Sequence, residues 1–529
     1  MNNTVKSFSI VTAFSVLTRL LSFLFKIWMS RSLGAETVGI YQIALSVILL
    51  LFSLTAGAPT VLSRKVAECA GRGDTARQNA LTTASLLLGG GIAVALCVVF
   101  YACSRFLGGI FADERCIPIF LIMLPALVTS SLYAPLRSWF WGRKKFIVFS
   151  ATELGDEVFK IGFSLLFAGG LVSTLTGAQG VALALVLSDV VSVCVLAVLF
   201  FKAGGRLFRP VGTKELLSAT LPLSAVRILT SLSASLTALV IPKRLVAGGM
   251  TVEYATAQYG RVAGMALPLI MAPVTVIAAL SVVLIPDIAE LASKKRYDEI
   301  REKVQTSLLF AAIVAAAFFA LYVPLGKELG TFFFGDEAAV AAVLIFPLAL
   351  NQVTTPVLNS LGMEKITFAS CVAGLVCTLP CIFFLPSVIG IYAVAVASGA
   401  AFTVTSLINC VALRKKLGKI GGTGKTAAVC LFSFPLALLG FFSERLLSPL
   451  LGTTGTLILL SVAITGLFVL FVAVFGIVDI KAFFAMALPS RADFSTVLSK
   501  RKKRAQRQQK KRTERNRRKV YINKTLFVL

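Results

Sequence analysis

The chain is dominated by long apolar runs that short polar or glycine-rich segments interrupt. A helix that crosses a bilayer needs about 20 mostly apolar residues, and about fourteen runs reach that length. They lie at 8–28, 39–62, 80–103, 116–137, 147–170, 178–201, 214–241, 258–285, 304–325, 337–360, 366–386, 388–412, 426–446 and 454–478. The pattern predicts an all-α polytopic membrane protein with about 14 transmembrane helices. The weakest break between neighbouring runs is at Pro386–Ser387.

The composition supports this fold class. Hydrophobic residues make up 57% of the 529 residues and charged residues 14%, with a mean hydropathy of +0.88. Soluble domains carry roughly 25% charged residues, so a soluble or disordered chain is excluded. The sequence has 10 cysteines and no histidine. Most of the cysteines lie in apolar runs, which favours packing over metal binding or redox chemistry, and no cofactor is expected.

The two halves of the chain repeat one another weakly. Ser85–Leu87 matches Ser307–Leu309, and Gly142, Lys145 and Ser150 match Gly362, Lys365 and Ser370 in the same order. Because a six-helix unit returns to its starting side, the repeats are parallel. We therefore expect two pseudo-symmetric six-helix lobes, at 1–203 and 204–412. Two additional helices at 413–478 and a basic tail at 479–529 complete the chain.

Basic residues are concentrated in alternate loops. The chain has 52 Lys and Arg against 24 Asp and Glu, a net charge of +28. The loops near 63–79, 138–146, 202–214, 294–303 and 413–425 are rich in Lys and Arg. By the positive-inside rule these loops face the cytoplasm, which places both termini there. The tail is expected to be disordered and to meet anionic membrane lipids rather than nucleic acid.

Cations inside the predicted spans are the candidate substrate-binding residues. Arg19 and Arg227 lie near the centres of corresponding helices in the two halves, Lys26 lies two turns after Arg19, and Arg261 lies near an outer helix end. Charge within a membrane is unfavourable and usually faces a cavity or a partner. Paired arginines could bind phosphate oxygens there. The alternative is that each side chain extends to the interface or pairs with a carboxylate.

Acids inside the spans are the candidate ion-coupling or gating residues. Glu153, Asp156 and Glu157 share a helix face with Lys160, and Asp189 stands alone in the following helix. Such residues could bind a coupling proton or sodium ion. A self-neutralising network for the first three, and a basic partner for Asp189, are the alternatives.

Two blocks of sequence resemble the polysaccharide-exporter branch of the multidrug/oligosaccharidyl-lipid/polysaccharide (MOP) flippase superfamily, in particular relatives of stage V sporulation protein B and lipid II flippases. The similarity extends from about residue 5 to 478. The blocks comprise Thr18–Leu21, Ser30–Glu36 and Gly39–Gln42, and then Ile241–Leu245, Ala255–Gly260, Gly264–Leu269 and Leu284–Pro286.

The resemblance implies fourteen helices in two lobes. It also implies a non-enzymatic flippase that moves an undecaprenyl-pyrophosphate-linked saccharide from the inner to the outer leaflet by alternating access. Arg19, Lys26 and Arg261 occupy places similar to cavity arginines of the family, and Arg31 is similar in motif. Family members more often have Arg at the position of Lys26, where this chain has a point charge instead of a forked donor.

Three other functions compete with this hypothesis. An ion-coupled multidrug exporter of the same superfamily would need an acidic cavity, and the predicted cavity is basic. A membrane enzyme would need a sizeable loop with clustered acids, which the sequence lacks. A scaffold would depend on the basic tail. We expect a monomeric, multi-pass protein of the bacterial plasma membrane, with roles in cell-wall, peptidoglycan or sporulation polysaccharide assembly.

Overall fold

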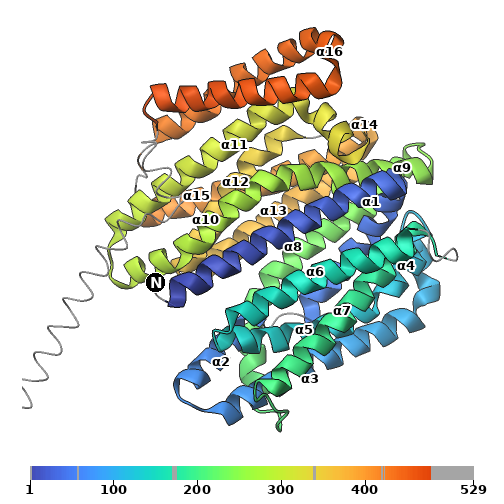
Figure 1. The fold of residues 1–529 in the computed structure, drawn as a ribbon, viewed down its shortest axis with the longest axis vertical. Coiled ribbons are helices and arrows are strands. Elements are labelled where there is room, and N and C mark those ends of the chain that lie inside the picture. The colour runs from blue at the N-terminus through green and yellow to red at the C-terminus, as the bar shows by residue number, and fades with distance from the viewer. Residues whose placement is uncertain are drawn as a thin grey trace, which may run out of the picture. The chain divides into compact units, whose positions relative to one another are not determined.

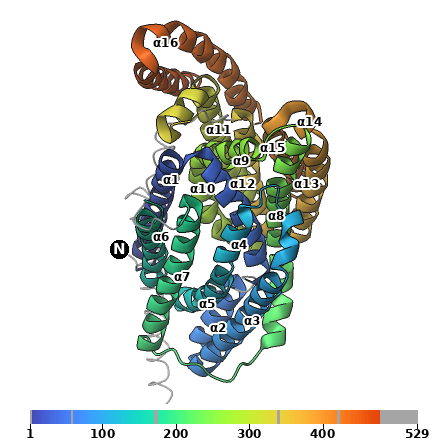
Figure 2. The ribbon, with the colours of Figure 1, turned by 90° about the vertical axis from the view of Figure 1, so that its right-hand side faces the viewer.

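The computed structural model describes residues 3–55, 59–169, 175–336, 341–418, 421 and 423–477. All regular structure in these ranges is helical (Figures 1 and 2). The chain divides into two units, Met1–Ile464 and Thr465–Leu529. The contacts discussed below all lie within the first unit. The predicted basic tail, 479–529, lies outside the described residues.

The helices follow the apolar runs. They are α1 (Asn3–Thr55), α2 (Pro59–Gly71), α3 (Thr75–Ala102), η1 (Ser104–Gly109), α4 (Cys116–Met123), α5 (Pro125–Gly142), α6 (Phe146–Ala168), α7 (Gly177–Lys202), α8 (Thr213–Ala247), α9 (Val252–Gly260), η2 (Arg261–Ala266), α10 (Leu267–Ser293), α11 (Tyr297–Phe334), η3 (Ala342–Leu344), α12 (Ile345–Ser360), α13 (Glu364–Phe384), α14 (Pro386–Ile389), η4 (Gly390–Tyr392), α15 (Ala393–Leu417) and α16 (Thr423–Val474).

The prediction of an all-helical membrane protein is confirmed. Eleven helical stretches among the described residues are long and apolar enough to cross a membrane. Two of them, in α1 and α16, each contain two predicted spans joined across a glycine with non-helical backbone angles, Gly34 and Gly452. Counting each of these twice and adding the charge-bearing α6 accounts for the fourteen predicted spans.

The structure corrects one predicted helix boundary and confirms another. The run at 39–62 is too long, because α1 ends at Thr55 and Pro59 begins the separate helix α2. Proline favours a first helical position, where its missing N–H leaves no hydrogen bond unmade. The weak break at Pro386–Ser387 is confirmed, since α13 ends at Phe384 and α14 begins at Pro386.

Two buried clusters hold the helices together. The larger one includes Phe120 of α4, Ile241 of α8 and Tyr259 of α9, and so connects the first half of the chain to the second. The smaller one surrounds Trp139 of α5, whose ring packs edge-on against Phe200 of α7. Helix α1 contacts α4, α6, α8 and α9, so it lies where the two halves meet.

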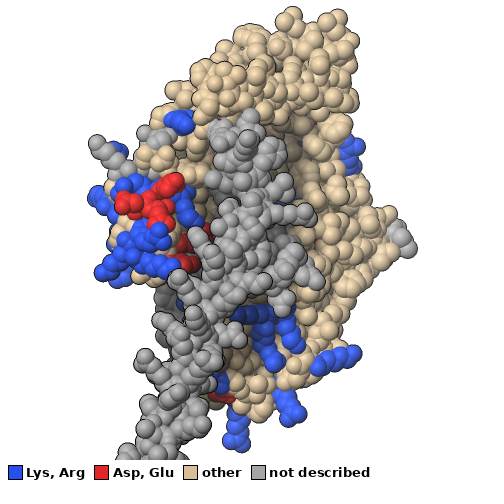
Figure 3. Space-filling model, turned by 60° about the vertical axis from the view of Figure 1, so that its left-hand side comes forward, with Lys and Arg blue, Asp and Glu red and all other residues tan. Residues whose placement is uncertain are grey.

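The outer surface is apolar over large areas. Val98, Phe159 and Val195 of three different helices are exposed, as a lipid-facing surface requires. Figure 3 shows most of the visible described surface as uncharged, with Lys and Arg gathered in clusters and acids beside one of them. One charged group lies where α10 meets α11, with ion pairs Asp287–Lys303 and Glu290–Lys294.

Candidate functional site

A glycine-dependent crossing brings α1 against α9. A Cβ atom added to Gly39 would lie 2.1 Å from the carbonyl oxygen of Thr256, and one added to Gly260 would lie 2.1 Å from that of Ala35. Side-chain atoms do not fit at such distances, so both positions require glycine. The bend at Gly34, with φ of 78°, turns the chain just before this crossing. The two halves of the chain therefore meet backbone to backbone here.

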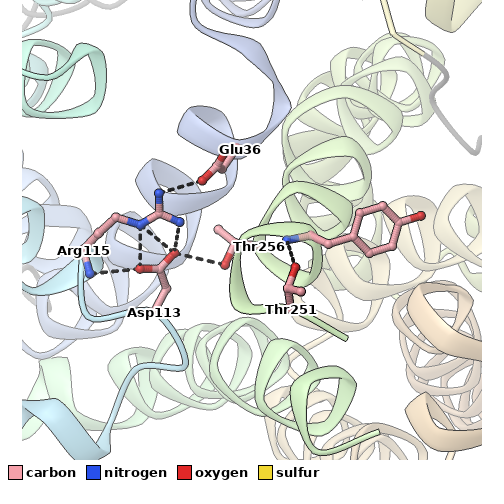
Figure 4. A network of polar contacts seen from close by, with 6 residues as sticks. Glu36, Asp113, Arg115, Thr251 and Thr256 are labelled. Atoms are coloured by element: carbon pink, nitrogen blue, oxygen red, sulfur yellow. Dashed lines mark hydrogen bonds and ion pairs between the residues drawn. The ribbon is translucent and has the colours of Figure 1, made fainter. Parts of the chain in front are cut away.

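A polar cluster lies beside the crossing (Figure 4). Arg115 donates from Nη2 to Asp113 Oδ2 at 2.7 Å and from Nη1 to Glu36 Oε1 at 2.6 Å. The Thr256 hydroxyl donates to Asp113 Oδ2 at 3.3 Å. Thr251 caps the first turn of α9 by accepting from the Tyr254 N–H, which fixes the helix that presents Thr256. The cluster joins α1 and the loop before α4 to α9.

Asp113 is the buried centre of this cluster, with its side chain 3% exposed. Burial alone would raise the pKa of its carboxyl group. Hydrogen bonds from Arg115 and Thr256, together with the guanidinium charge, outweigh burial and hold the pKa below its ordinary value. Asp113 is therefore an ionised carboxylate at neutral pH, and its charge is part of what joins the halves.

Further polar contacts join the halves at the same end. Lys243 of α8 donates from Nζ to the carbonyl oxygen of Gly109 at 2.5 Å. Ser30 donates to the carbonyl oxygen of Phe334 at 3.1 Å. Arg31 donates from Nε to the carbonyl oxygen of Phe333 at 2.8 Å and also bonds that of Phe332. We use the name Gly34 end for the region that contains the bend at Gly34, the crossing at Gly39 and Gly260, and these contacts.

The predicted substrate cation Arg31 thus caps the last turn of α11, whose carbonyl groups would otherwise lack donors. Arg261, at the start of the π-helical turn η2, forms an ion pair with Asp336 at 2.8 Å. Both guanidinium groups are engaged by the protein in this conformation.

Arg19 and Arg227 differ from these two residues. Both side chains are exposed, and neither makes a hydrogen bond or ion pair with another side chain in the described ranges. Arg19 lies about four helical turns before Gly34, and Arg227 lies more than five turns before the end of α8. At 1.5 Å per residue, both are roughly 20–30 Å along their helices from the Gly34 end. Helix α8 packs on α1, and the hydrogen bond between them, from Ser235 to the carbonyl oxygen of Ser46 at 2.7 Å, lies in the part of α1 after Gly34.

Lys26 lies in a different environment. It is partly buried, and the charges of Lys160 and Glu157 of α6 both act on it. Lys160 bonds Glu157 Oε2 at 2.5 Å and lies 5.7 Å from the centre of the Phe25 ring. Glu157 Oε1 is buried and has no hydrogen-bond partner in the described part of the chain. Lys26 therefore belongs to a buried charge network with α6.

The remaining predicted acids lie around this network. Glu153 pairs with Arg137 at 2.5 Å. Asp156 Oδ1 accepts from the Ser192 hydroxyl at 2.8 Å, and Asp189 Oδ2 accepts from Thr129 at 3.3 Å. Asp156 and Asp189 act electrostatically on each other across the α6–α7 contact. The sequence did not indicate that the acids of two successive helices would face one another.

The cluster of Asp113, Arg115, Glu36 and Thr256 was not predicted from the sequence. The available signal was an acid and an arginine two residues apart in a short loop, together with a polar residue in each resembling block. Among the described residues, no group of three or more Cys, Asp or Glu side chains is arranged to hold a metal ion.

Comparisons of the sequence with known proteins identify its family and relatives. The family model described as polysaccharide biosynthesis protein matches residues 4–292. Stage V sporulation protein B of Bacillus subtilis (strain 168) is 24% identical over 447 residues, which cover 78% of this chain and 84% of that protein. Sporulation protein YkvU of the same organism is 24% identical over 367 residues, covering 66% and 80%.

Solved structures share the fold. The lipid II flippase MurJ in an inward closed conformation has a TM-score of 0.64 at 12% identity, covering 88% of this chain and 98% of that one. An inward-facing multidrug resistance MATE family transporter of the MOP superfamily also has a TM-score of 0.64, at 15% identity, covering 76% and 94%. These likenesses show a shared fold. The chain belongs to the polysaccharide biosynthesis protein family.

Proposed function

We propose that this protein flips an undecaprenyl-diphosphate-linked saccharide from the inner to the outer leaflet of the bacterial plasma membrane by alternating access. The observation that carries the proposal is that the guanidinium groups of Arg19 and Arg227, on helices from different halves of the chain, are exposed and have no side-chain partner among the described residues. Guanidinium groups bind phosphate oxygens through paired donors. The family match supports a saccharide as the cargo.

The proposed orientation places the Gly34 end on the outer side. The basic loops at the other ends of the helices would then face the cytoplasm, as the positive-inside rule requires, and both termini with them. In this conformation the contacts of the Gly34 end join the two halves on the outside. The diphosphate would therefore enter from the cytoplasmic side, while the polyprenyl chain stays in lipid.

Opening to the outside requires the Gly34 end to separate. The Asp113–Thr256 and Lys243–Gly109 bonds and the contacts of Arg31 would break as lobes 1–203 and 204–412 rock apart. Arg31 and Arg261 would then be free to contact the departing headgroup. The two additional predicted helices at 413–478 have no assigned role in this scheme.

The acids of α6 and α7 are the proposed coupling site. Asp156 and Asp189 each accept one hydroxyl hydrogen bond and have no cationic partner within bonding distance among the described residues. A proton or sodium ion bound between them would relieve the repulsion of two carboxylates. Glu153 and Glu157, each paired with a cation, would set the position of α6.

Native mass spectrometry of the purified protein tests the binding step. We expect a polyprenyl-diphosphate saccharide to copurify with the wild type and to be lost from Arg19→Ala/Arg227→Ala. Arg206→Ala removes an exposed loop cation and should retain the lipid. Retention in the double variant would contradict the site. Absence of lipid in all variants, with organic cations raising the melting temperature, would favour the alternative of a multidrug exporter.

A further inference from the structure

An open groove lies between the end of α8 and α13, at the Gly34 end. Its volume is about 360 Å³, and its lining consists of Arg244, Leu379, Pro380, Phe383 and Phe384. The two helices that form the groove, α8 and α13, pack directly against each other. Four of the five lining residues are apolar, so the single charge in the wall comes from Arg244.

Arg244 has a buried donor that no described residue satisfies. Its Nε atom is buried, without a hydrogen-bond partner in the described ranges, and its guanidinium forms no ion pair with a described residue. The preceding residue, Lys243, bonds the Gly109 carbonyl and so differs in this respect. The last turn of a helix favours a cation through its dipole. However, a guanidinium beside apolar side chains in a membrane protein strongly favours an anionic partner.

The groove opens onto an exposed apolar surface and lies apart from the proposed saccharide site. Phe383 is 45% exposed, Phe384 69%, and the neighbouring Val388 82%. Arg244 follows Arg227 by almost five helical turns, which separates the two residues by roughly 25 Å along α8. A ligand at Arg244 would therefore not occupy the position of a headgroup bound at Arg227.

We propose that this groove binds an anionic phospholipid of the surrounding membrane. Arg244 donates to the phosphate oxygens, and the first part of an acyl chain packs against Pro380, Phe383 and Phe384. A single guanidinium above an apolar wall is complementary to a phosphate joined to a hydrocarbon chain. Arg244 belongs to the Ile241–Leu245 block, in which the proposed flippase function assigns a role to Lys243 but none to Arg244. The inference does not depend on that function.

The test is a lipid titration of the delipidated, full-length protein by native mass spectrometry. Phosphatidylglycerol is added to the wild type, to Arg244→Gln and to the control Arg105→Gln, which removes an exposed cation of η1. We expect Arg244→Gln to weaken the tightest phosphatidylglycerol site about tenfold, as expected for the loss of one charge-assisted contact. Arg105→Gln should leave that site unchanged. Phosphatidylcholine should bind the wild type more weakly, because its ammonium group neutralises the phosphate.

Two further variants separate lipid binding from folding. Leu379→Trp fills the groove and keeps the guanidinium, so it should also weaken phosphatidylglycerol binding. Arg244→Lys keeps the charge and should bind with intermediate strength. Equal binding by the wild type, Arg244→Gln and Leu379→Trp would overturn the proposal, as would equal losses in Arg244→Gln and Arg105→Gln. Displacement of phosphatidylglycerol from this site by equimolar undecaprenyl diphosphate would identify a different occupant and overturn the assignment.

Discussion

Asp113 shows how a single buried charge can link two halves of a membrane protein. Its carboxylate accepts hydrogen bonds from Arg115 and from Thr256 of α9, and Arg115 also reaches Glu36. An ionised carboxylate without these donors would be unfavourable at this depth of burial. The stability of the Gly34 end therefore depends on the ionisation of Asp113.

Asp113→Asn is expected to lower the melting temperature in detergent and to flatten its dependence on pH in the acid range. The removal of a charged acceptor from a buried hydrogen-bond network costs about 1–3 kcal/mol. The pKa of Asp113 is lowered in the folded protein. Its contribution to the free energy of unfolding is therefore complete above the ordinary Asp pKa of about 3.9, and it is lost as the pH falls through the lower pKa of the folded protein. Thermal melts from pH 7 to pH 3 measure both effects.

Glu114→Gln is the matched control, since Glu114 is exposed beside Asp113. Equal effects of the two substitutions would show that the cluster has no special role.

The buried pair of Glu157 and Lys160 gives a second prediction for individual residues. Glu157→Gln leaves Lys160 and the adjacent Lys26 without their counter-charge, which should destabilise the protein by roughly 3–5 kcal/mol. Adding Lys160→Gln should recover part of that loss, because it removes one uncompensated cation. Denaturation of purified protein followed by Trp fluorescence measures the difference.

Glu153→Gln, on the same helix, removes a carboxylate that is 38% exposed and should cost under about 1 kcal/mol. A double variant less stable than Glu157→Gln alone would contradict the proposed pairing.

At the scale of the elements, hydropathy determines most of what could be predicted. A helix is the structure that satisfies the backbone of a single apolar segment in lipid, so the runs of apolar residues predicted the spans well. The contact between α1 and α9 could not be predicted in this way. It depends on which faces of two distant helices meet, and Gly39 and Gly260 looked like ordinary membrane-helix glycines in the sequence.

Gly39→Ala and Gly260→Ala are expected to disrupt this crossing. Each new methyl group would lie 2.1 Å from a backbone oxygen, so α1 and α9 must move apart, at a cost of about 1–3 kcal/mol or more. We expect lower melting temperatures and faster alkylation of the native Cys116, whose side chain is buried in this conformation. Gly91→Ala is the control, because no neighbouring atom lies within 4 Å of its added Cβ. It should be neutral or slightly stabilising, as alanine favours helices. Unchanged alkylation in all three variants would show that the crossing does not close this end.

The candidate site illustrates the same limit of sequence reasoning. Arg19 and Arg227 were recognisable because a charge within an apolar run is rare. Their exposure and lack of partners, and the engagement of Arg31 and Arg261 with carbonyl and carboxylate groups, depend on tertiary packing. Lys26 looked equivalent to Arg19 along one helix face, yet it packs against the charges of α6.

At the scale of the molecule, the two halves of the chain are joined at one end and carry their exposed arginines away from it. The halves of the chain are joined by polar and glycine contacts at the Gly34 end. The two arginines without a side-chain partner among the described residues lie some 20–30 Å from that end, on α1 and α8. In the proposed transport cycle this conformation is closed at the Gly34 end, so release to the outside requires that end to separate.

Transport of a labelled polyprenyl-diphosphate saccharide in proteoliposomes tests this account most directly. Its arrival in the opposite leaflet can be measured by the access of a membrane-impermeant glycan-binding probe. The account predicts transport by the wild type and by Arg206→Ala, and a loss of at least tenfold in Arg19→Ala/Arg227→Ala at equal protein content. Undiminished transport by the double variant, or no transport by the wild type above empty vesicles, would contradict it.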